Sequence, residues 1–177
     1  MNSQPTHLQP LSTQTKVSRF LMNWLLLTIV WIGFTGTFDL HELLTGIVVA
    51  GILSFMAIRI FTCCDLALLA PKKLFYLGKF IVVFLVALVK SNFDMARRVL
   101  SPALPINPGV VKFKSQLKSN FAKMVLANAI TLTPGTLSID VIDDTFYIHW
   151  IDVKSADPEV AFKEIAEDFE NLLIKIF

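Results

Sequence analysis

The stretch Leu126 to Val141, LANAITLTPGTLSIDV, places a helix end, a tight turn and a strand next to one another. Pro134 lacks the backbone N–H that would continue a helix, and it disfavours the α conformation of the residue before it. Gly135 tolerates the positive φ that the third residue of a type II turn requires. The sequence therefore predicts that a helix ends here and that Thr133 to Thr136 form a tight corner.

Beyond the corner, polar and apolar residues alternate, which is typical of a half-buried strand. One side of this strand is expected to be apolar and to carry Leu137, Ile139 and Val141, and the other side is expected to be polar and to carry Thr136, Ser138 and Asp140.

The residues around this strand predict a small α+β domain over 110–177. The expected elements are a strand at 110–114, a helix at 117–129, a strand at 136–142, a turn at 143–144, a strand at 145–153 and one C-terminal helix from 158. Asp157 can cap the last helix, and Pro158 fits its first position. The order βαββα indicates helices on one face of a three-stranded sheet, part of a ferredoxin-like layout. About 70 residues is near the lower limit for an independent core, so the polar sheet face and the edge of the first strand are candidate partner surfaces.

Composition indicates a membrane protein. Hydrophobic residues make up 54% of the chain and charged residues only 17%, against roughly 25% charged in soluble domains. A net charge of +2 is too small to suggest nucleic acid as a partner. We expect a polar tail at 1–19, a membrane domain at 20–100 and a Pro-rich linker at 101–109 before the soluble domain.

The first half predicts a transmembrane helical hairpin. Residues 20–38 hold no formal charge and span about 28 Å as a helix, enough to cross a hydrocarbon core. A short turn with Asp39, His41 and Glu42 leads to a second helix at about 43–61. Four glycines are small enough to allow close helix approach, namely Gly33, Gly36, Gly46 and Gly51.

The third apolar run, within a helix at about 72–100, is ambiguous. Only ten residues separate Lys79 from Lys90, so the helix is either tilted or interfacial, or a short transmembrane helix whose lysine snorkels. Lys79, Lys90, Asp94 and Arg97 fall near one face and form a narrow polar stripe. Lys and Arg flank the hairpin but are absent from its turn, so the positive-inside rule favours two spans, a tilted or interfacial third helix and a cytoplasmic C-terminal domain.

Catalytic signals are missing from the sequence, which has no Gly-rich phosphate loop, no Cys or His pair at metal spacing and no nucleophile motif. We therefore expect a non-enzymatic chain with no cofactor and no metal site. Cys63 and Cys64 are adjacent, too close for an unstrained disulfide, and are expected to be ordinary thiols. His149 is expected to be a structural histidine on its strand.

Several motifs carry a family resemblance. They are SNFDMARRVL at 91–100, PGVV at 108–111, the stretch at 126–141, and YIHW at 147–150 with the following Asp152. With the hydrophobic first half, they make the chain similar, over nearly everything after residue 20, to the MnhE/MrpE family, the E subunits of the multisubunit Na⁺/H⁺ antiporters of the Mrp/Mnh type.

The resemblance implies a complex in the bacterial cytoplasmic membrane, in which larger subunits translocate the ions and this chain is an accessory subunit in contact with other subunits and with lipid. A stand-alone, membrane-anchored lipid- or protein-binding module is the alternative, and a direct part in the ion pathway is a third possibility. The residues expected to matter for structure or interfaces are Lys79, Lys90, Asp94, Arg97, Asn128, Pro134, Gly135 and Thr136.

Overall fold

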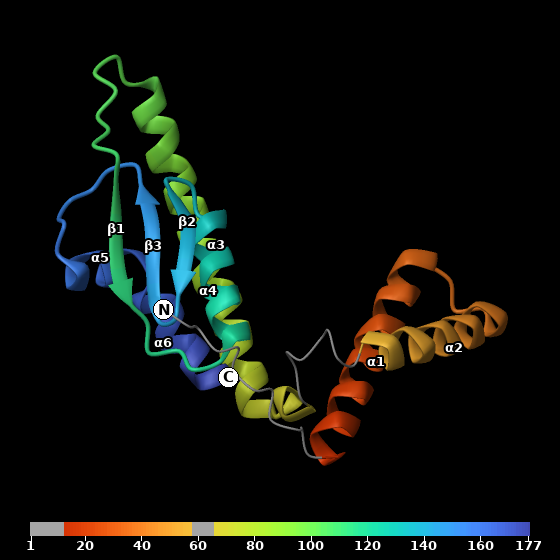
Figure 1. The fold of residues 1–177 in the computed structure, drawn as a ribbon. Coiled ribbons are helices and arrows are strands. Elements are labelled where there is room, and N and C mark those ends of the chain that lie inside the picture. The colour runs from red at the N-terminus through yellow and green to blue at the C-terminus, as the bar shows by residue number, and fades with distance from the viewer. Residues whose placement is uncertain (1–12, 58–65) are drawn as a thin grey trace. The chain divides into compact units, whose positions relative to one another are not determined.

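The fold is taken from a computed structural model that describes residues 13–57 and 66–177 (Figure 1). The chain forms two compact units, Met1–Ala70 and Pro71–Phe177. Cys63 and Cys64 lie outside the described residues, so the prediction about their chemistry stays a prediction.

The first unit is a helical hairpin. Helix α1, Thr13–Thr35, packs against α2, Leu40–Ala57, and a short 3₁₀ helix, η1, follows at Leu66–Leu69. Gly36 ends α1 with a φ of +65°, and its N–H donates to the carbonyl of Ile32 at 2.9 Å. A left-handed glycine after the last helical residue is a common way to satisfy the final carbonyls.

Two tryptophans of α1 pack onto glycines of α2. A Cβ added to Gly46 would lie 2.3 Å from Cδ1 of Trp31, and one added to Gly51 would lie 3.7 Å from Nε1 of Trp24. The predicted close approach thus holds at these two glycines. By contrast, nothing lies within 4 Å of a Cβ added to Gly33 or to Gly36, so the prediction of close approach is wrong at these two glycines.

The second unit is an α+β domain with a long preceding helix. Its elements are α3 Pro71–Leu100, β1 Gly109–Lys114, α4 Asn120–Leu132, β2 Thr136–Ile142, β3 Thr145–Trp150, α5 Pro158–Ile165 and α6 Glu167–Ile176. The sheet has the order β1-β3-β2, and both pairings are antiparallel. The helices lie on one side of it (Figure 1), as the βαββα pattern predicts.

The core lies between the sheet and the helices. Phe113 of β1 and Phe146 of β3 stack with ring centroids 5.5 Å apart, and Phe162 of α5 packs edge-on against Phe113 at 5.6 Å. Phe113 and Phe146 are buried almost completely. Burial of such large apolar side chains stabilises the fold by about 1.5 to 3 kcal/mol each.

The prediction for the sides of β2 is wrong for its first half. Leu137 and Ile139 are 49% and 55% exposed, whereas Ser138 faces the helices and its hydroxyl donates to the carbonyl of Ala127 at 3.0 Å. A register shift between Ser138 and Asp140 returns Val141 to the half-buried side. An inserted residue in one strand reverses the side on which later residues point.

The prediction of one C-terminal helix is also wrong, since the helix is broken at Ala166. Asp157 caps α5 as predicted, accepting a hydrogen bond from the N–H of Glu159 at 2.9 Å. At Ala166 the backbone leaves the helical conformation, with φ −123°. The break lets α5 pack on β1 while α6 packs on α3.

Helix α3 is continuous over 30 residues and packs with the C-terminal elements, although the sequence interpretation grouped it with the membrane hairpin. Rings of Phe80 and Phe84 lie 6.0 and 6.4 Å from the ring of Phe169 in α6. Two described helices are long and apolar enough to cross a membrane, α1 over Val17–Thr35 and α3. The described part of α2 is apolar but shorter, over Leu40–Met56.

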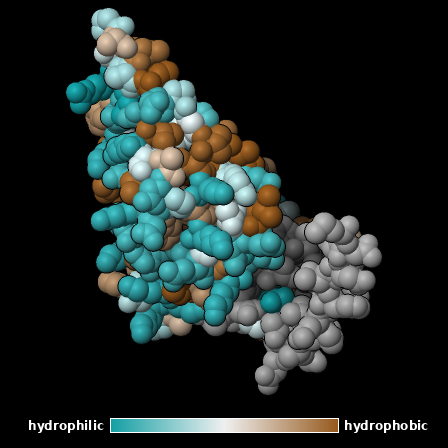
Figure 2. All heavy atoms as spheres, turned by 60° about the vertical axis from the view of Figure 1, so that its left-hand side comes forward, coloured by the Kyte–Doolittle hydropathy of each residue, from teal (hydrophilic) through white to brown (hydrophobic). Residues whose placement is uncertain are grey.

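The side of the second unit that carries β1 and α5 is mainly hydrophilic, as Figure 2 shows. Exposed side chains on these elements include Lys112, Lys114, Glu159 and Glu164. This side of the domain is therefore suited to water rather than to lipid.

Candidate functional site

A cleft of about 650 Å³ lies between α3, the corner that follows α4, and the segments that follow β3. Helix α3 contributes Val82, Val86 and Lys90 to its wall, and the acidic first turn of α6 contributes Glu167 and Asp168. The cleft is therefore lined by both apolar and charged side chains.

The corner at one wall has the predicted geometry. Gly135 has a φ of +98°, and the N–H of Thr136 donates to the carbonyl of Thr133 at 3.3 Å. The hydroxyl of Thr136 lies 2.7 Å from the carbonyl of Ile130, to which it donates. A side chain on Gly135 would meet the methyl groups of its neighbours, because its Cβ would lie 3.2 Å from both Ile151 Cγ2 and Met95 Cε.

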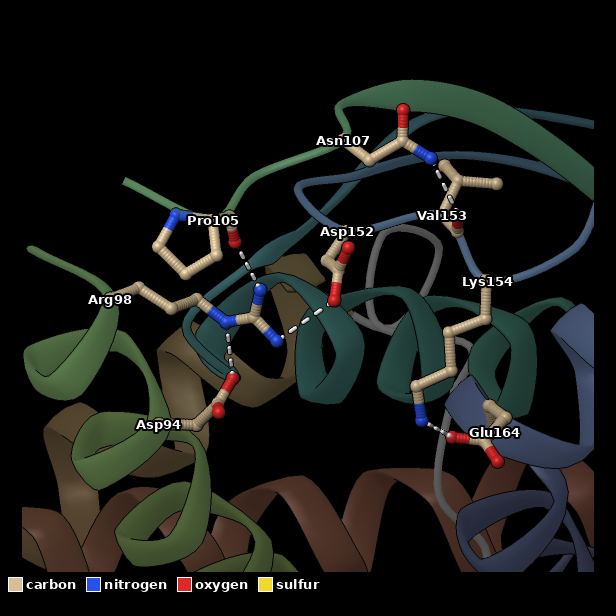
Figure 3. A network of polar contacts seen from close by, with 8 residues as sticks. All are labelled: Asp94, Arg98, Pro105, Asn107, Asp152, Val153, Lys154 and Glu164. Carbon is tan, nitrogen blue, oxygen red and sulfur yellow. Dashed lines mark hydrogen bonds and ion pairs between the residues drawn. The ribbon is translucent and has the colours of Figure 1, made fainter. Parts of the chain in front are cut away.

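Arg98 is the centre of the polar network in Figure 3. Its guanidinium donates to the carboxylate of Asp94 at 2.7 Å, to the carboxylate of Asp152 at 2.9 Å and to the carbonyl of Pro105 at 2.6 Å. Only 18% of its side chain is exposed. The planar guanidinium with several fixed donors suits this role, because it can bind three acceptors in different directions.

The segment after Pro105 is held beside the end of β3. Backbone hydrogen bonds join Asn107 to Ile151 and Val153, and the side-chain amide of Asn107 donates to the carbonyl of Val153 at 2.8 Å (Figure 3). Lys154 and Glu164 form an ion pair nearby. These contacts fix the Pro-rich linker against the domain over this part of its length.

Hydrogen bonds of Glu170 and Lys123 connect further elements of the domain. The carboxylate of Glu170 is buried and accepts from the hydroxyl of Ser115 at 2.6 Å and from the N–H of Gln116 at 2.8 Å. Lys123 donates to Asp144 at 2.6 Å, and this hydrogen bond holds the pKa of the Asp144 carboxyl below its ordinary value.

The structure brings together some of the residues singled out from the sequence. Those that line the cleft are Lys90, Asp94, Pro134, Gly135 and Thr136. Lys79 and Arg97 are exposed on α3 and lie outside the cleft, and Asn128 is exposed on α4. Asp94 was predicted to belong to a polar stripe with Arg97, but its carboxylate binds the neighbouring Arg98.

The sequence reasoning missed Arg98 as a separate site residue, although it lies in the SNFDMARRVL motif. The signal was the spacing of Asp94 and Arg98, since residues i and i+4 on a helix are neighbours. No comparable local signal pointed to Asp152, which binds Arg98, or to Asn107, which binds Val153. Their contacts join segments that are far apart in sequence.

The arrangement is suited to holding segments of the second unit together. The carboxylates beside Arg98 are bound to it, and no group of three or more His, Cys, Asp and Glu residues that could hold a metal occurs in the described ranges 13–57 and 66–177. His149 lies on β3 between Val110 and Leu137 of the neighbouring strands.

Apolar helices long enough to cross a membrane, together with a small three-stranded α+β domain, define an α+β membrane protein. The profile of the Na⁺/H⁺ ion antiporter subunit family (MNHE) matches residues 24–176. The chain belongs to this family and is therefore a component of a transporter.

Relatives and a solved structure agree with this membership. The E subunit of the Na⁺/H⁺ antiporter of Alkalihalophilus pseudofirmus is 32% identical over 89% of this chain and 97% of its own length. The E1 subunit of the Staphylococcus haemolyticus antiporter is 33% identical over 80% of this chain and 87% of its own. A chain in the membrane-bound sulfane sulfur reductase, an archaeal respiratory membrane complex, is 44% identical, with a TM-score of 0.82 over 90% of this chain and 99% of that one.

Proposed function

We propose that this chain is an accessory subunit of a multisubunit Na⁺/H⁺ antiporter, needed for assembly or full activity and not carrying the ion path. The observation that carries the proposal is that 20–38 and 43–58, the apolar runs of the hairpin, hold no Asp, Glu, Lys, Arg or His. An ion or proton pathway in a membrane is normally marked by such residues.

Three side chains of the hairpin support this interpretation because their polar groups bind backbone carbonyls. Ser54 is fully buried, and its hydroxyl donates to the carbonyl of Phe20 at 2.8 Å. The indoles of Trp24 and Trp31 donate to the carbonyls of Ile47 and Glu42 at 2.9 and 3.1 Å. These contacts join α1 to α2, so they serve helix packing rather than ion binding.

The partners proposed for the chain are the other subunits of the antiporter and the lipid around them. The alternative is that the chain is a subunit of a respiratory membrane complex. One observation favours it: the chain is 44% identical to a chain of such a complex, against 32% for the antiporter subunit of Alkalihalophilus pseudofirmus. Purification from native membrane through a tag on this chain separates the two, since redox subunits accompany it only in the respiratory case.

We also propose that residues 101–177 face the cytoplasm of the cell membrane, because Lys and Arg flank the hairpin and are absent from its turn. An impermeant thiol reagent applied to intact cells should then label Gly36→Cys and miss Cys63, Cys64 and Ser155→Cys. Labelling of Ser155→Cys would overturn this orientation.

Deletion of the gene tests the accessory role. Cells that lack the chain should tolerate less Na⁺ or Li⁺ at alkaline pH, and the remaining subunits should assemble poorly or exchange ions slowly. A chain that is stable by itself, together with normal tolerance and normal assembly in its absence, would favour the stand-alone binding module instead.

A further inference from the structure

We propose that α3 lies along the membrane surface, with its apolar face in the acyl chains of one leaflet and a row of basic side chains on the phosphates of anionic phospholipid. The proposal concerns how the second unit sits on the bilayer, and it does not depend on antiport.

Helix α3 has an exposed apolar face along most of its length. Phe75, Val82, Val86, Val89 and Phe93 are each 55 to 75% exposed. At about 100° per residue, these five positions fall within roughly 60° of one another. The opposite side of the helix is the packed one and holds Phe80, the buried residue of α3.

The packed side makes a transmembrane position of α3 unfavourable. Contacts with the domain run from Tyr76, whose ring lies 5.3 Å from Nζ of Lys175, to Arg98, which binds Asp152. This stretch is about 33 Å of helix, roughly the full thickness of a hydrocarbon core. A spanning α3 would therefore carry the charged α6 into lipid, at high cost.

A basic row borders the apolar face. Lys72, Lys79, Lys90 and Arg97 are all exposed, and their spacings of 7, 18 and 25 residues from Lys72 place them within about 20° of one direction. None of the four has a carboxylate within 4.0 Å in the part of the chain that the structure describes.

Apolar and basic faces side by side are typical of helices that lie in the interface of anionic membranes. The positive charge of this row favours anionic phospholipid as the ligand, because cations without a carboxylate partner beside an apolar face complement phosphate groups above acyl chains. The cleft adds room at this border, since Val82, Val86 and Lys90 all line it and can contact one amphiphile. The membrane that holds the hairpin supplies this ligand.

Depth measurements on the full-length chain in nanodiscs test the position of α3. With Cys63 and Cys64 replaced by Ser, nitroxide labels are placed singly at Phe75, Val86 and Phe93, which share one helix face. A surface helix should give all three labels the same depth, reported by collision with dissolved oxygen and with a water-soluble nickel chelate. A label at Lys79 should be shallower.

A spanning helix would give a different profile, with Val86 deepest and Phe75 shallower by about 16 Å. That result overturns the proposal. So does protection of Val86 from both collision reagents in the purified complex, because a partner subunit would then cover the apolar face.

The lipid preference is tested with spin-labelled phosphatidylglycerol and phosphatidylcholine. The natural chain should immobilise a larger fraction of the anionic analogue. Replacing Lys72, Lys79, Lys90 and Arg97 by Gln should remove at least half of this excess. Replacing Lys112 and Lys114 by Gln, on the exposed side of β1, should preserve it.

An equal excess in the two variants, or no excess in the natural chain, overturns the proposal. All six substituted side chains are exposed, so both variants should fold. Their circular dichroism spectra check this. Antiport activity is measured separately, so failure of the lipid proposal leaves the accessory role untouched, and the converse holds too.

Discussion

Nη2 of Arg98 lies 2.9 Å from Oδ2 of Asp152, so the end of α3 is bound to the segment that follows β3. The two residues are far apart in sequence, and the same guanidinium also binds Asp94. One side chain thus joins the long helix, the linker carbonyl of Pro105 and the segment after β3.

Arg98→Gln should destabilise the second unit by about 1 to 2 kcal/mol, because it leaves two carboxylates without their charged donor. The neighbouring Arg97→Gln is the control, since Arg97 is exposed and outside this network. Thermal unfolding of the full chain in mild detergent measures both. Equal unfolding temperatures for the two variants would contradict the structural role of Arg98.

Gly135→Val should cost about 1 to 3 kcal/mol, because a β-branched residue fits poorly at positive φ and its side chain would also meet Met95 and Ile151. Less subunit should reach the membrane, and less complex should form. Thr136→Ser keeps the hydroxyl that binds Ile130 and should change neither.

Two other outcomes of Gly135→Val can be told apart by quantifying the subunit and the complex in the same membranes. Normal subunit levels with assembly abolished would place Gly135 at a partner interface. Normal levels with normal exchange would contradict the structural role of the corner.

Gly46→Ala should weaken the hairpin, because the new methyl group would overlap the ring of Trp31. Overpacking of this kind costs about 1 to 3 kcal/mol. Gly33→Ala is the matched control, with open space around its Cβ. The measurement is the fraction of each variant that stays monodisperse after heating in detergent. Equal fractions for the two variants would argue against close packing at Gly46.

The Lys123–Asp144 pair should make a contribution to stability that depends on pH. The folded pKa of Asp144 is lowered from 3.8, so the contribution is present above pH 3.8 and is lost as the pH falls through the folded pKa. The natural chain should therefore unfold at a higher temperature than Asp144→Asn at pH 6, and the difference should shrink at pH 3.

Asp143→Asn is the control for this pair, because Lys123 binds the carbonyl of Asp143 and not its carboxylate. At pH 6 its unfolding temperature should therefore lie closer to that of the natural chain than the unfolding temperature of Asp144→Asn does. If the difference in unfolding temperature between the natural chain and Asp144→Asn grows on acidification, the Lys123–Asp144 pair does not make the contribution to stability assigned to it.

Local signals predicted much of the fold. Pro134 and Gly135 fixed the corner, Asp157 and Pro158 marked the start of α5, and glycines in the hairpin indicated close helix packing. Each of these features depends on a few adjacent residues whose backbone preferences are strong. The order of the strands along the chain followed from these boundaries.

What the sequence could not show depended on contacts between distant segments. The bulge in β2 places Leu137 and Val141 on opposite sides of the strand, although alternation alone predicted the same side for both. The apolar repeat from Phe162 to Ile176 continued across Ala166, so it concealed a break that is set by packing on two different elements. The site around Arg98 needed Asp152, which only the folded chain brings near.

Everted membrane vesicles test the accessory role most directly. Na⁺-dependent proton movement is followed by fluorescence dequenching in vesicles that contain the whole complex, the complex without this chain, or this chain alone. We predict exchange with the whole complex, little or none without this chain, and none with this chain alone. Na⁺-dependent proton movement by this chain alone would contradict the account.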